Sequence, residues 1–457
     1  MGDELVKEDI STITQDQLDA MVKLHKRYLD GRLGGLKAVL KNTDLTGLDL
    51  SGKDLRQADF SGCIMQYMDL SDTNFCEATL YACDLSFSNL NNTKFARSDC
   101  RGTQIEGANL AGADLNAADL REGKLASSET YGKAKFVSFK GANLSGARLS
   151  GALVNRADFS DANLSRASMN NADLRNANFK GADLSDADIK GAQLEGASFQ
   201  QSILTGVNHE VLHNAGLDLN DAITDQNIGR KLKEKKESLQ QLLSLHHLWI
   251  DSVGQKGERL DISDYDLREM KSFKQEVLTA IIAKNTKFIG LNFYQCEFQS
   301  AILDESDFRQ CDMEEVDLRG ASLKSANLCH TNMRNANLLP LLIGQKAFYQ
   351  RFSPCDLSGA QLRYADLRGA SLKNVCFKGA DLSYADLSGS NLCDADFTDA
   401  QIKNTNFDGA KLDGACFDGA KSGKIFSLEA LQSSGPSRQG ADSHAGEDAA
   451  EQKSNAE

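Results

Sequence analysis

The sequence predicts a mainly β fold in which the chain winds into a stacked solenoid, and three observations support this prediction. First, from Leu45 to Leu125 a large residue, nearly always Leu or Phe, falls on every fifth position. Second, a period of five fits neither regular structure, because each step turns about 140° on an α-helix and changes face on a strand. Third, the chain has only three Pro residues, as expected of stacked strands that use every backbone N–H. A chain that turns once every five residues would bury all of these large residues.

The large residue of each repeat, its central residue, keeps a constant frame in four runs. These runs extend over 45–125, 139–204, 288–338 and 357–417. The steps across the two breaks, from 125 to 139 and from 338 to 357, are each one residue short of a multiple of five. We therefore expect the solenoid to continue through each break with a one-residue deletion and a local bulge or loop.

The letters of the repeat predict a direction for each side chain. The central residue and the small residue two places before it should point inward, and the polar residue between them should point outward. The last position is often Gly, Asp or Asn, which suit the turn that follows. The predicted core includes Leu110, Leu115, Leu120, Leu174, Leu184, Leu367 and Leu382. Five cysteines stand at the small inward position and are interpreted as buried, reduced residues: Cys63, Cys83, Cys296, Cys311 and Cys355.

Two segments that precede the repeats have helical patterns. Residues 12–31 offer Thr14 and Gln17 as a capping box and Gly31 as a residue that ends the helix. Residues 222–251 predict a longer helix that contains a basic stretch at 230–236.

The two helical segments resemble each other. Residues 24–30 align without gaps with residues 245–251, and each segment precedes a run of repeats. The chain therefore reads as a duplication of one unit, a helical lead-in followed by a solenoid. A further helical stretch is expected over about 268–284.

These patterns predict five regions. They are an N-terminal helical lead-in or cap, a first solenoid, a helical linker with the second lead-in, a second solenoid, and a short cap followed by a disordered tail, at 1–43, 44–208, 209–285, 286–418 and 419–457. Residues 425–431 are candidates for the cap, and the Ser-, Gly- and acid-rich segment from about Leu431 is expected to be disordered.

The repeat, as in Ala108-Asn109-Leu110 and Ala113-Asp114-Leu115, resembles the pentapeptide-repeat family, whose consensus is A(D/N)LXX. The resemblance covers most of both arrays and implies a right-handed quadrilateral β-helix with four pentapeptides per coil. It thereby implies about eight coils in the first array and about seven in the second, at about 4.8 Å per coil. The open ends of such a solenoid are exposed strand edges that need caps, and the helical lead-ins are candidates for them.

The bulk properties favour a cytoplasmic, bacterial protein without cofactors. No run of about 18 apolar residues exists, so no membrane span is expected. The acidic start, Met1-Gly2-Asp3-Glu4, does not resemble a signal peptide. The eleven cysteines form no CxxC pair, which leaves a zinc ribbon unsupported.

The net charge of −14 raises a second functional class, because some pentapeptide-repeat proteins bind type II topoisomerases by imitating a DNA duplex. Each array, however, has a net charge of only −5 and carries many basic residues. A duplex carries one charge per about 1.7 Å, or about 24 over about 40 Å. The charge therefore makes a DNA mimic the alternative hypothesis, and it also argues against direct binding of nucleic acid.

A third class, a zinc-dependent peptidase, is suggested by residues 209–213. His209, Glu210 and His213 match HExxH, in which one helix face holds zinc and the Glu acts as base. Leu219 stands where an extended version of the motif has its third His, although His246 or Glu234 are alternatives. The competing interpretation, which we favour, is the end of a coil that passes into a linker.

The sequence thus predicts a non-enzymatic scaffold for protein–protein interaction. A solenoid with polar faces offers an extended surface for a protein partner along its length. No catalytic, cofactor-binding or metal-binding residue is predicted. The partner, the face that binds it and the oligomeric state stay open at this point.

Overall fold

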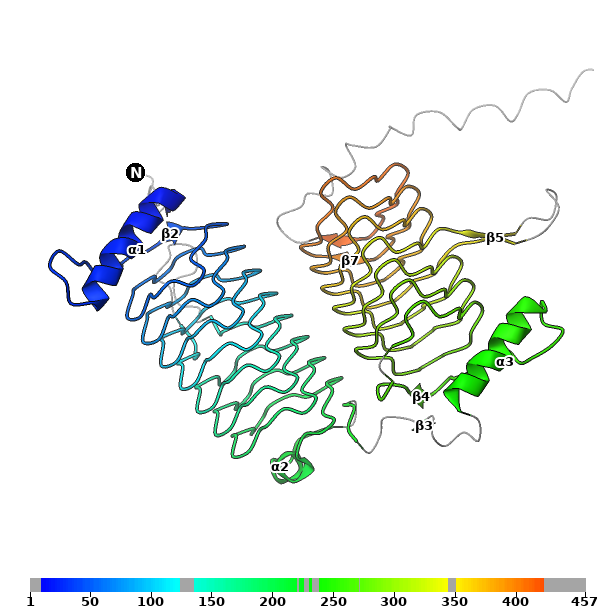
Figure 1. The fold of residues 1–457 in the computed structure, drawn as a ribbon, viewed down its shortest axis with the longest axis horizontal. Coiled ribbons are helices and arrows are strands. Elements are labelled where there is room, and N and C mark those ends of the chain that lie inside the picture. Colours follow the sequence, from blue (N-terminus) through cyan, green and yellow to red (C-terminus); the bar gives the residue numbers. More distant parts are fainter. Residues whose placement is uncertain are drawn as a thin grey trace, which may run out of the picture. The chain divides into compact units, whose positions relative to one another are not determined.

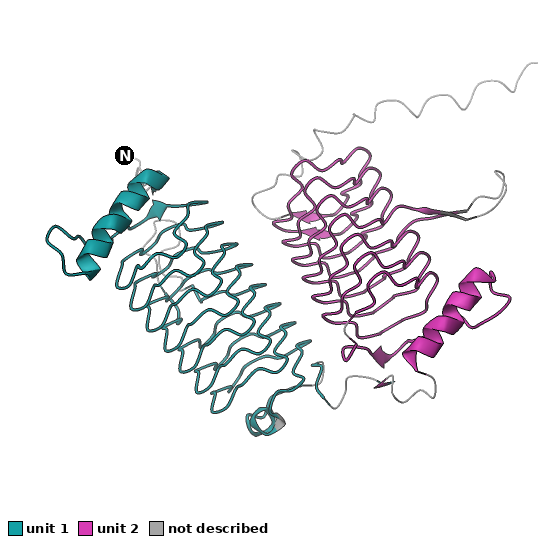
Figure 2. Cartoon of the chain, in the orientation of Figure 1, with its two compact units in different colours: residues 1–230 teal, residues 231–457 magenta. Residues whose placement is uncertain are grey.

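A computed structural model describes the chain over residues 10–123, 135–219, 222–225, 230–231, 238–270, 272–343 and 351–422. The chain divides into two compact units, 1–230 and 231–457 (Figure 2). Each unit contains its own continuous hydrophobic core.

Unit 1 is a parallel β-solenoid whose coils contain twenty residues (Figure 1). On one side, Asp59 pairs with Thr79 and Thr79 pairs with Asp99 in parallel. Each rung uses two backbone hydrogen bonds, here Phe60 N–H to Thr79 O (2.8 Å) and Thr79 N–H to Ala58 O (2.8 Å). Four such ladders run five residues apart, so each coil has four sides of one pentapeptide each. The predicted four-sided coil is confirmed.

The core consists of the central residues and the small residues two places before them, as predicted. Phe139, Phe159, Phe179 and Phe199 stack with ring centroids 4.8, 5.0 and 4.9 Å apart, which is the spacing of neighbouring strands. All seven leucines predicted to be inward are buried: Leu110, Leu115, Leu120, Leu174, Leu184, Leu367 and Leu382. The five inward cysteines are also buried, and all cysteines in the chain are free thiols.

The corner after each side explains the last letter of the repeat. The residue two places after the central one lies in the left-handed region, as at Gly112 (φ 67°) and Asn92 (φ 55°). Glycine adopts this conformation without steric cost, and Asn and Asp tolerate it best among other residues. The predicted turn chemistry therefore holds.

Helix α1 (Gln15–Leu29) covers the first coil of unit 1. It begins at the predicted capping box, in which Gln17 N–H donates to Thr14 Oγ1 and Thr14 N–H donates to Gln17 Oε1. Strand β1 (Ser11–Thr12) precedes the helix and pairs in parallel with β2 (Thr43–Asp44), where the coils begin. The lead-in is thus both a helix and an extra strand on the open edge.

A buried histidine joins helix α1 to the chain that enters the solenoid. His25 accepts a hydrogen bond at Nδ1 from the Ala38 N–H (3.0 Å) and donates from Nε2 to the Arg56 carbonyl (3.1 Å). Leu36 N–H donates to Leu24 O at 3.1 Å. The imidazole therefore satisfies backbone groups that the edge of the solenoid leaves unpaired.

Helix α2 (His209–Asn214) lies at the other end of unit 1. Leu212 is completely buried in the core, so the helix covers the last coil. The chain then returns to the ladder, where Ile223 pairs in parallel with Ile203. The solenoid therefore extends past the boundary at 208 that the repeat frame predicts.

Unit 2 repeats this architecture. Helix α3 (Leu239–Asp251) begins at a capping box of Ser238 and Gln241. Strand β3 (Arg230–Lys231) pairs with β4 (Tyr265–Asp266), as β1 pairs with β2. The predicted helix over 222–251 is therefore wrong in its first part, since residues 222–225 belong to the first solenoid and α3 starts at Leu239.

The predicted duplication of the lead-in is confirmed at atomic detail. His246 Nδ1 accepts from the Leu260 N–H (3.1 Å), as His25 does from Ala38. Glu258 N–H donates to Leu245 O at 3.1 Å, the counterpart of the bond from Leu36 to Leu24. The similarity between the two short segments thus reflects one shared way of attaching a helix to a solenoid edge.

The second solenoid starts earlier than predicted. Its first ladder contact joins Asp261 to Ile282, so the coils begin well before the predicted boundary at 286. One ladder of this unit passes through eight successive coils, one more than expected, at Asp266, Lys287, Asp307, Asn327, Gln361, Asp381, Gln401 and Lys421. Its last rungs include β7 (Gln401–Ile402) and β8 (Lys421–Ser422), which pair in parallel.

The helix predicted over 268–284 is wrong, because this segment forms solenoid coils. Phe273 and Leu278 are buried central residues, and Val277 pairs in parallel with Glu297. The step from the central residue Leu267 to Phe273 is six residues instead of five, which hides the frame. The spacing of the apolar residues around this irregular step resembles that of an amphipathic helix.

The two breaks are insertions, so the predicted one-residue deletion is wrong. Gln104 pairs with Ser138 and Ser322 with Asp356, so each of these coils is longer than the usual twenty residues. Each excursion starts as an antiparallel pair, Gly123 with Lys135 in unit 1 and β5 (Leu341–Ile343) with β6 (Arg351–Ser353) in unit 2. Figure 1 shows the second excursion leaving its coils at β5. Central residues 120 and 338 are thus followed by 139 and 357, with an arm between them.

Three predictions fall on other parts of the chain. The expected cap at 425–431, the tail from Leu431 and residues 232–236 of the basic stretch at 230–236 lie outside the described residues. Within the described part of the chain, no helix has the length and apolar character needed to cross a membrane.

Candidate functional site

The outer surface of the coils is built from one recurring contact. The residue before the central one is often Asp, and its carboxylate accepts the backbone N–H two residues later, as Asp49 does from Ser51 (2.7 Å). When that later residue is Arg, its guanidinium also folds back on the same carboxylate through Nε and Nη2. Such forks occur at Arg56, Arg101, Arg121, Arg175, Arg268, Arg309, Arg319 and Arg368.

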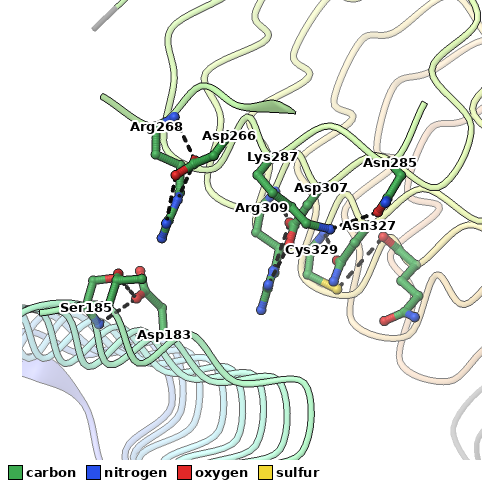
Figure 3. A network of polar contacts seen from close by, with 12 residues as sticks. Asp183, Ser185, Asp266, Arg268, Asn285, Lys287, Asp307, Arg309, Asn327 and Cys329 are labelled. Atoms are coloured by element: carbon green, nitrogen blue, oxygen red, sulfur yellow. Dashed lines mark hydrogen bonds and ion pairs between the residues drawn. The ribbon is translucent and has the colours of Figure 1, made fainter. Parts of the chain in front are cut away.

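Figure 3 shows two of these forks in unit 2. Arg268 engages Asp266 through Nε (2.9 Å) and Nη2 (3.1 Å), and Arg309 engages Asp307 through Nε (2.9 Å) and Nη2 (2.6 Å). Planar bidentate pairs of this kind hold a guanidinium in one orientation. The repeat therefore places arginine heads in fixed positions on the surface.

On one side of unit 1, three forks surround a hollow of about 560 Å³. The ladder of that side runs through Asp99, Asp119, Leu153 and Asp173. The residues two places later along the chain therefore lie in a row, one per coil. The hollow is lined by four members of this row and four neighbours: Arg101, Arg121, Asn155, Arg175, Glu122, Phe136, Arg156 and Asn176.

The excursion of unit 1 forms one wall of this hollow. Glu122 and Phe136 are its first and last parts, held together by the pairing of Gly123 with Lys135. The excursion passes very close to the corner of the preceding coil. A Cβ on Gly102 would lie only 2.9 Å from Gly123 Cα. Glycine at both positions thus allows the arm to lie beside the arginine row.

The guanidiniums form the outer layer of the hollow and the carboxylates lie beneath them. The Arg121 side chain is 49% exposed and that of Asp119 is 25%, whereas Arg175 and Asp173 are 49% and 11% exposed. Hydrogen bonds from Arg175 hold the pKa of Asp173 below its ordinary value, and burial opposes this only in part. The pKa of Arg101 is raised by its hydrogen bond to Asp99. All these groups therefore stay ionised at neutral pH, with the positive charges facing solvent.

Arg156 differs from the other three arginines. It forms no ion pair with any described residue, and its Cζ lies 5.8 Å from the centroid of the Phe136 ring. The neighbouring Asn155 Oδ1 is buried and has no hydrogen-bond partner among the described residues. The hollow thus contains a cation and an amide whose partners are not supplied by the surrounding coils.

This arrangement can bind an anion but offers little for catalysis. Among the described residues, its lining contains no His, Cys, Ser or Lys, and its one carboxylate is that of Glu122. Arginine does not exchange protons at neutral pH and serves for recognition of carboxylates and phosphates.

The HExxH motif forms helix α2, and this helix covers the last coil of the solenoid. Asn208 caps the helix by accepting the Glu210 N–H (2.9 Å), Leu212 is buried in the core, and His213 is exposed. The side chain of His209 and the alternative ligand Glu234 lie outside what the structure describes.

The other alternative ligand, His246, is buried and bonds the backbone of Leu260. Among the described residues, no three metal-ligating side chains form a group that could hold a metal ion.

Sequence reasoning missed the arginine hollow. The signal that could have found it is the Asp-x-Arg motif at Asp99 and Asp119, one regular coil apart, and again at Asp173. The excursion makes the following coil longer than the others, so a strict twenty-residue frame does not bring Arg175 into line with Arg121.

Comparison with known protein families agrees with this architecture. The model of pentapeptide repeats matches eight stretches that together span more than half of the chain, at 38–75, 83–121, 142–181, 167–206, 283–314, 311–339, 351–389 and 376–414. The chain belongs to the pentapeptide-repeat family. Its fold class is that of the family, the right-handed β-helix that the resemblance implied. No curated protein matches the chain.

Several solved structures that are similar to this chain are pentapeptide-repeat proteins. HetL from the cyanobacterium Nostoc sp. strain PCC 7120, involved in heterocyst differentiation regulation, is 19% identical over 86% of this chain and 94% of its own, with a TM-score of 0.20. QnrB1, a plasmid-mediated fluoroquinolone resistance protein, is 24% identical over 41% of this chain and 83% of its own, with a TM-score of 0.19. A protein from the Arabidopsis thaliana thylakoid lumen is 29% identical over 30% and 67%, with a TM-score of 0.11.

Proposed function

We propose that the protein is a non-enzymatic scaffold that binds protein partners on the faces of its two solenoids. The observation that carries this proposal is the arginine hollow, a surface site whose described lining consists mainly of arginines held in fixed orientations. The cores are filled by side chains, so the coils themselves are supports for such surfaces. Repeat solenoids commonly bind partners along their length.

The alternative, a DNA mimic that binds a type II topoisomerase, is less well supported. A mimic needs a row of uncompensated negative charges, whereas many surface carboxylates of these coils are covered by arginine or lysine, as Asp119 is by Arg121 and Asp396 by Lys378. The arginine hollow presents positive charge, whereas a DNA mimic needs negative charge. We expect the purified chain not to inhibit DNA supercoiling by gyrase at concentrations at which a mimic is active.

Site-specific photo-crosslinking in native cells tests the scaffold function. A benzophenone amino acid is placed on each of the four sides of one coil in unit 1 and one coil in unit 2. The positions in unit 1 are Ser61, Gln66, Ser71 and Cys76, and those in unit 2 are Thr398, Lys403, Asp408 and Asp413. We expect one protein to be captured repeatedly from one side or two adjacent sides. Absence of any reproducible crosslink from all eight positions would overturn the proposal.

A further inference from the structure

We propose that the arginine hollow of unit 1 binds an extended acidic segment, rich in Asp and Glu, of a protein partner. This inference rests on the proposed scaffold function and names the chemistry of the partner. It places recognition on one side of one solenoid, beside the excursion that begins at Glu122 and ends at Phe136.

The forks prepare the arginines for a second carboxylate. Arg101, Arg121 and Arg175 use Nε and Nη2 for the aspartates beneath them, and their Nη1 groups make no hydrogen bond with described residues. A guanidinium that is already held in place loses little rotational freedom when it binds a ligand. Each fork therefore presents a preoriented donor to solvent.

Arg156 supplies the uncompensated part of the site. Arg156 has no ion pair among the described residues and lies against Phe136 at 5.8 Å, which restricts its position. Asn155 is held in the row between Arg121 and Arg175, and its buried amide oxygen lacks a partner among the residues that the structure describes. The Asn155 oxygen is not accessible to a ligand, so the uncompensated group that an incoming carboxylate can pair with is Arg156.

The spacing of the row suits a polyvalent ligand. Neighbouring coils are about 4.8 Å apart, so the row from Arg101 to Arg175 spans three steps, or about 14 Å. That length is too great for a single phosphate, and it matches about five residues of extended peptide at about 3.3 Å each. Glu122 in the lining and the net charge of −5 over 44–206 argue against a nucleic acid strand.

The duplication shows that the fold alone does not create this hollow. The counterparts in unit 2 follow from the matching ladders, because the pair Ser322–Asp356 spans the second excursion as Gln104–Ser138 spans the first. In unit 2, Leu339 replaces Arg121, Asn374 replaces Arg156 and Cys393 replaces Arg175. Only Arg101 has an equivalent arginine, Arg319, with its own fork to Asp317 (2.7 Å). Unit 2 thus keeps two basic groups at this place, Arg319 and Lys373, the latter in the position of Asn155, whereas unit 1 has four arginines.

Fluorescence anisotropy of a fluorescein-labelled octaglutamate peptide tests the proposal on the full chain. The wild type should bind this probe and not octaglutamine, and binding should weaken with rising salt. Arg156→Gln, which breaks no ion pair, should weaken binding about 10-fold, the value of one charge-assisted hydrogen bond. Arg101→Gln should have a similar effect.

Arg319→Gln is the matched control, because it removes the same kind of fork from unit 2 and should leave binding unchanged. Equal affinity of Arg156→Gln and wild type, or no binding of octaglutamate at low salt, would overturn the acidic-segment proposal. Competition by inorganic phosphate at lower concentration than by unlabelled peptide would also overturn it, since the site would then hold a small anion. Each of these outcomes leaves the photo-crosslinking test of the scaffold function intact.

Discussion

At the scale of single residues, the two lead-in histidines combine a structural role with a sensitivity to pH. His25 and His246 are both buried, and each accepts a backbone N–H through Nδ1, which only an unprotonated nitrogen can do. Burial lowers the pKa of His25, and it lowers that of His246 to about 4, helped by the charges of His247 and Arg259. These rings therefore hold their caps in place as neutral groups.

We predict that the cap of unit 2 loses stability in mild acid through His246. The folded pKa of about 4 lies below the ordinary value of 6.5, so protons bind the unfolded state more tightly. The contribution is fully present above pH 6.5 and falls as the pH drops toward 4, by on the order of 2 kcal/mol at pH 4.5. The chain has one Trp, Trp249, whose ring lies 5.9 Å from that of His246.

Urea unfolding monitored by Trp249 fluorescence at pH 7.5 and 4.5 measures this effect. The matched variant His246→Asn keeps an acceptor but does not titrate, so its unfolding free energy should depend less on pH. Identical pH dependence of wild type and variant would contradict the assignment.

At the scale of elements, the two excursions show how a regular solenoid carries an irregular arm. Both arms replace a five-residue step by nineteen residues, and both cross a glycine corner of the preceding coil. A Cβ at Gly320 would lie 2.8 Å from Leu341 Cβ, just as one at Gly102 would meet Gly123. The need for glycine here comes from close contact between elements, because other corners with the same positive φ accept Asn or Asp.

We predict that Gly102→Asn displaces the base of the first excursion. The corner conformation tolerates Asn, but the new side chain would collide with Gly123. The paired amides of Gly123 and Lys135, which bond each other's carbonyls at 2.9 and 2.8 Å, should then exchange hydrogen at least about 10-fold faster.

Gly146→Asn is the control for this prediction. Gly146 also has a positive φ of 64°, but no atom lies within 4 Å of its hypothetical Cβ, so exchange at Gly123 and Lys135 should not change. Equal exchange rates in both variants would mean that the glycine contact does not position the arm.

At the scale of the whole molecule, the chain is two copies of one design that have diverged on the surface. Each copy has its own lead-in helix, extra strand, buried histidine and excursion. The cores are separate and continuous within each unit. Solenoid stability depends on contacts between neighbouring coils, which favours independent folding of each copy.

We therefore predict that residues 1–229 and 230–457, expressed separately so that β3 stays whole, each fold. Each should give a cooperative thermal transition, and the circular dichroism spectra of the two halves should add up to that of the full chain. A half that stays unfolded while the full chain folds would show that its edge needs the other unit. Mixing the purified halves would then restore the missing transition.

The repeat determined the core without help from tertiary structure. Once Leu110 and Ala108 are known to point inward, every residue at the same two positions of the repeat is predicted to be buried. The sides of a coil are too short to bury large residues in any other way. The family follows from the same repeat, the resemblance to that family implies the four-sided coil, and the alignment of residues 24–30 with 245–251 reveals the duplicated lead-ins. The capping box at Thr14 is equally local, since its partner is three residues away.

Only the tertiary structure decided where the excursions interrupt the repeat and which side chains lie together beside them. In the sequence, residues 125 and 139 look like central residues of one frame that has lost a residue. In the structure, Gln104 pairs directly with Ser138, so the residues between the two coils form an insertion. The hollow beside that insertion joins Arg101, on one coil, to Arg175, three coils away. The period of five determines which residues face outward. Which outward residues become neighbours across an insertion depends on the length of the insertion, and the five-residue pattern does not contain that length.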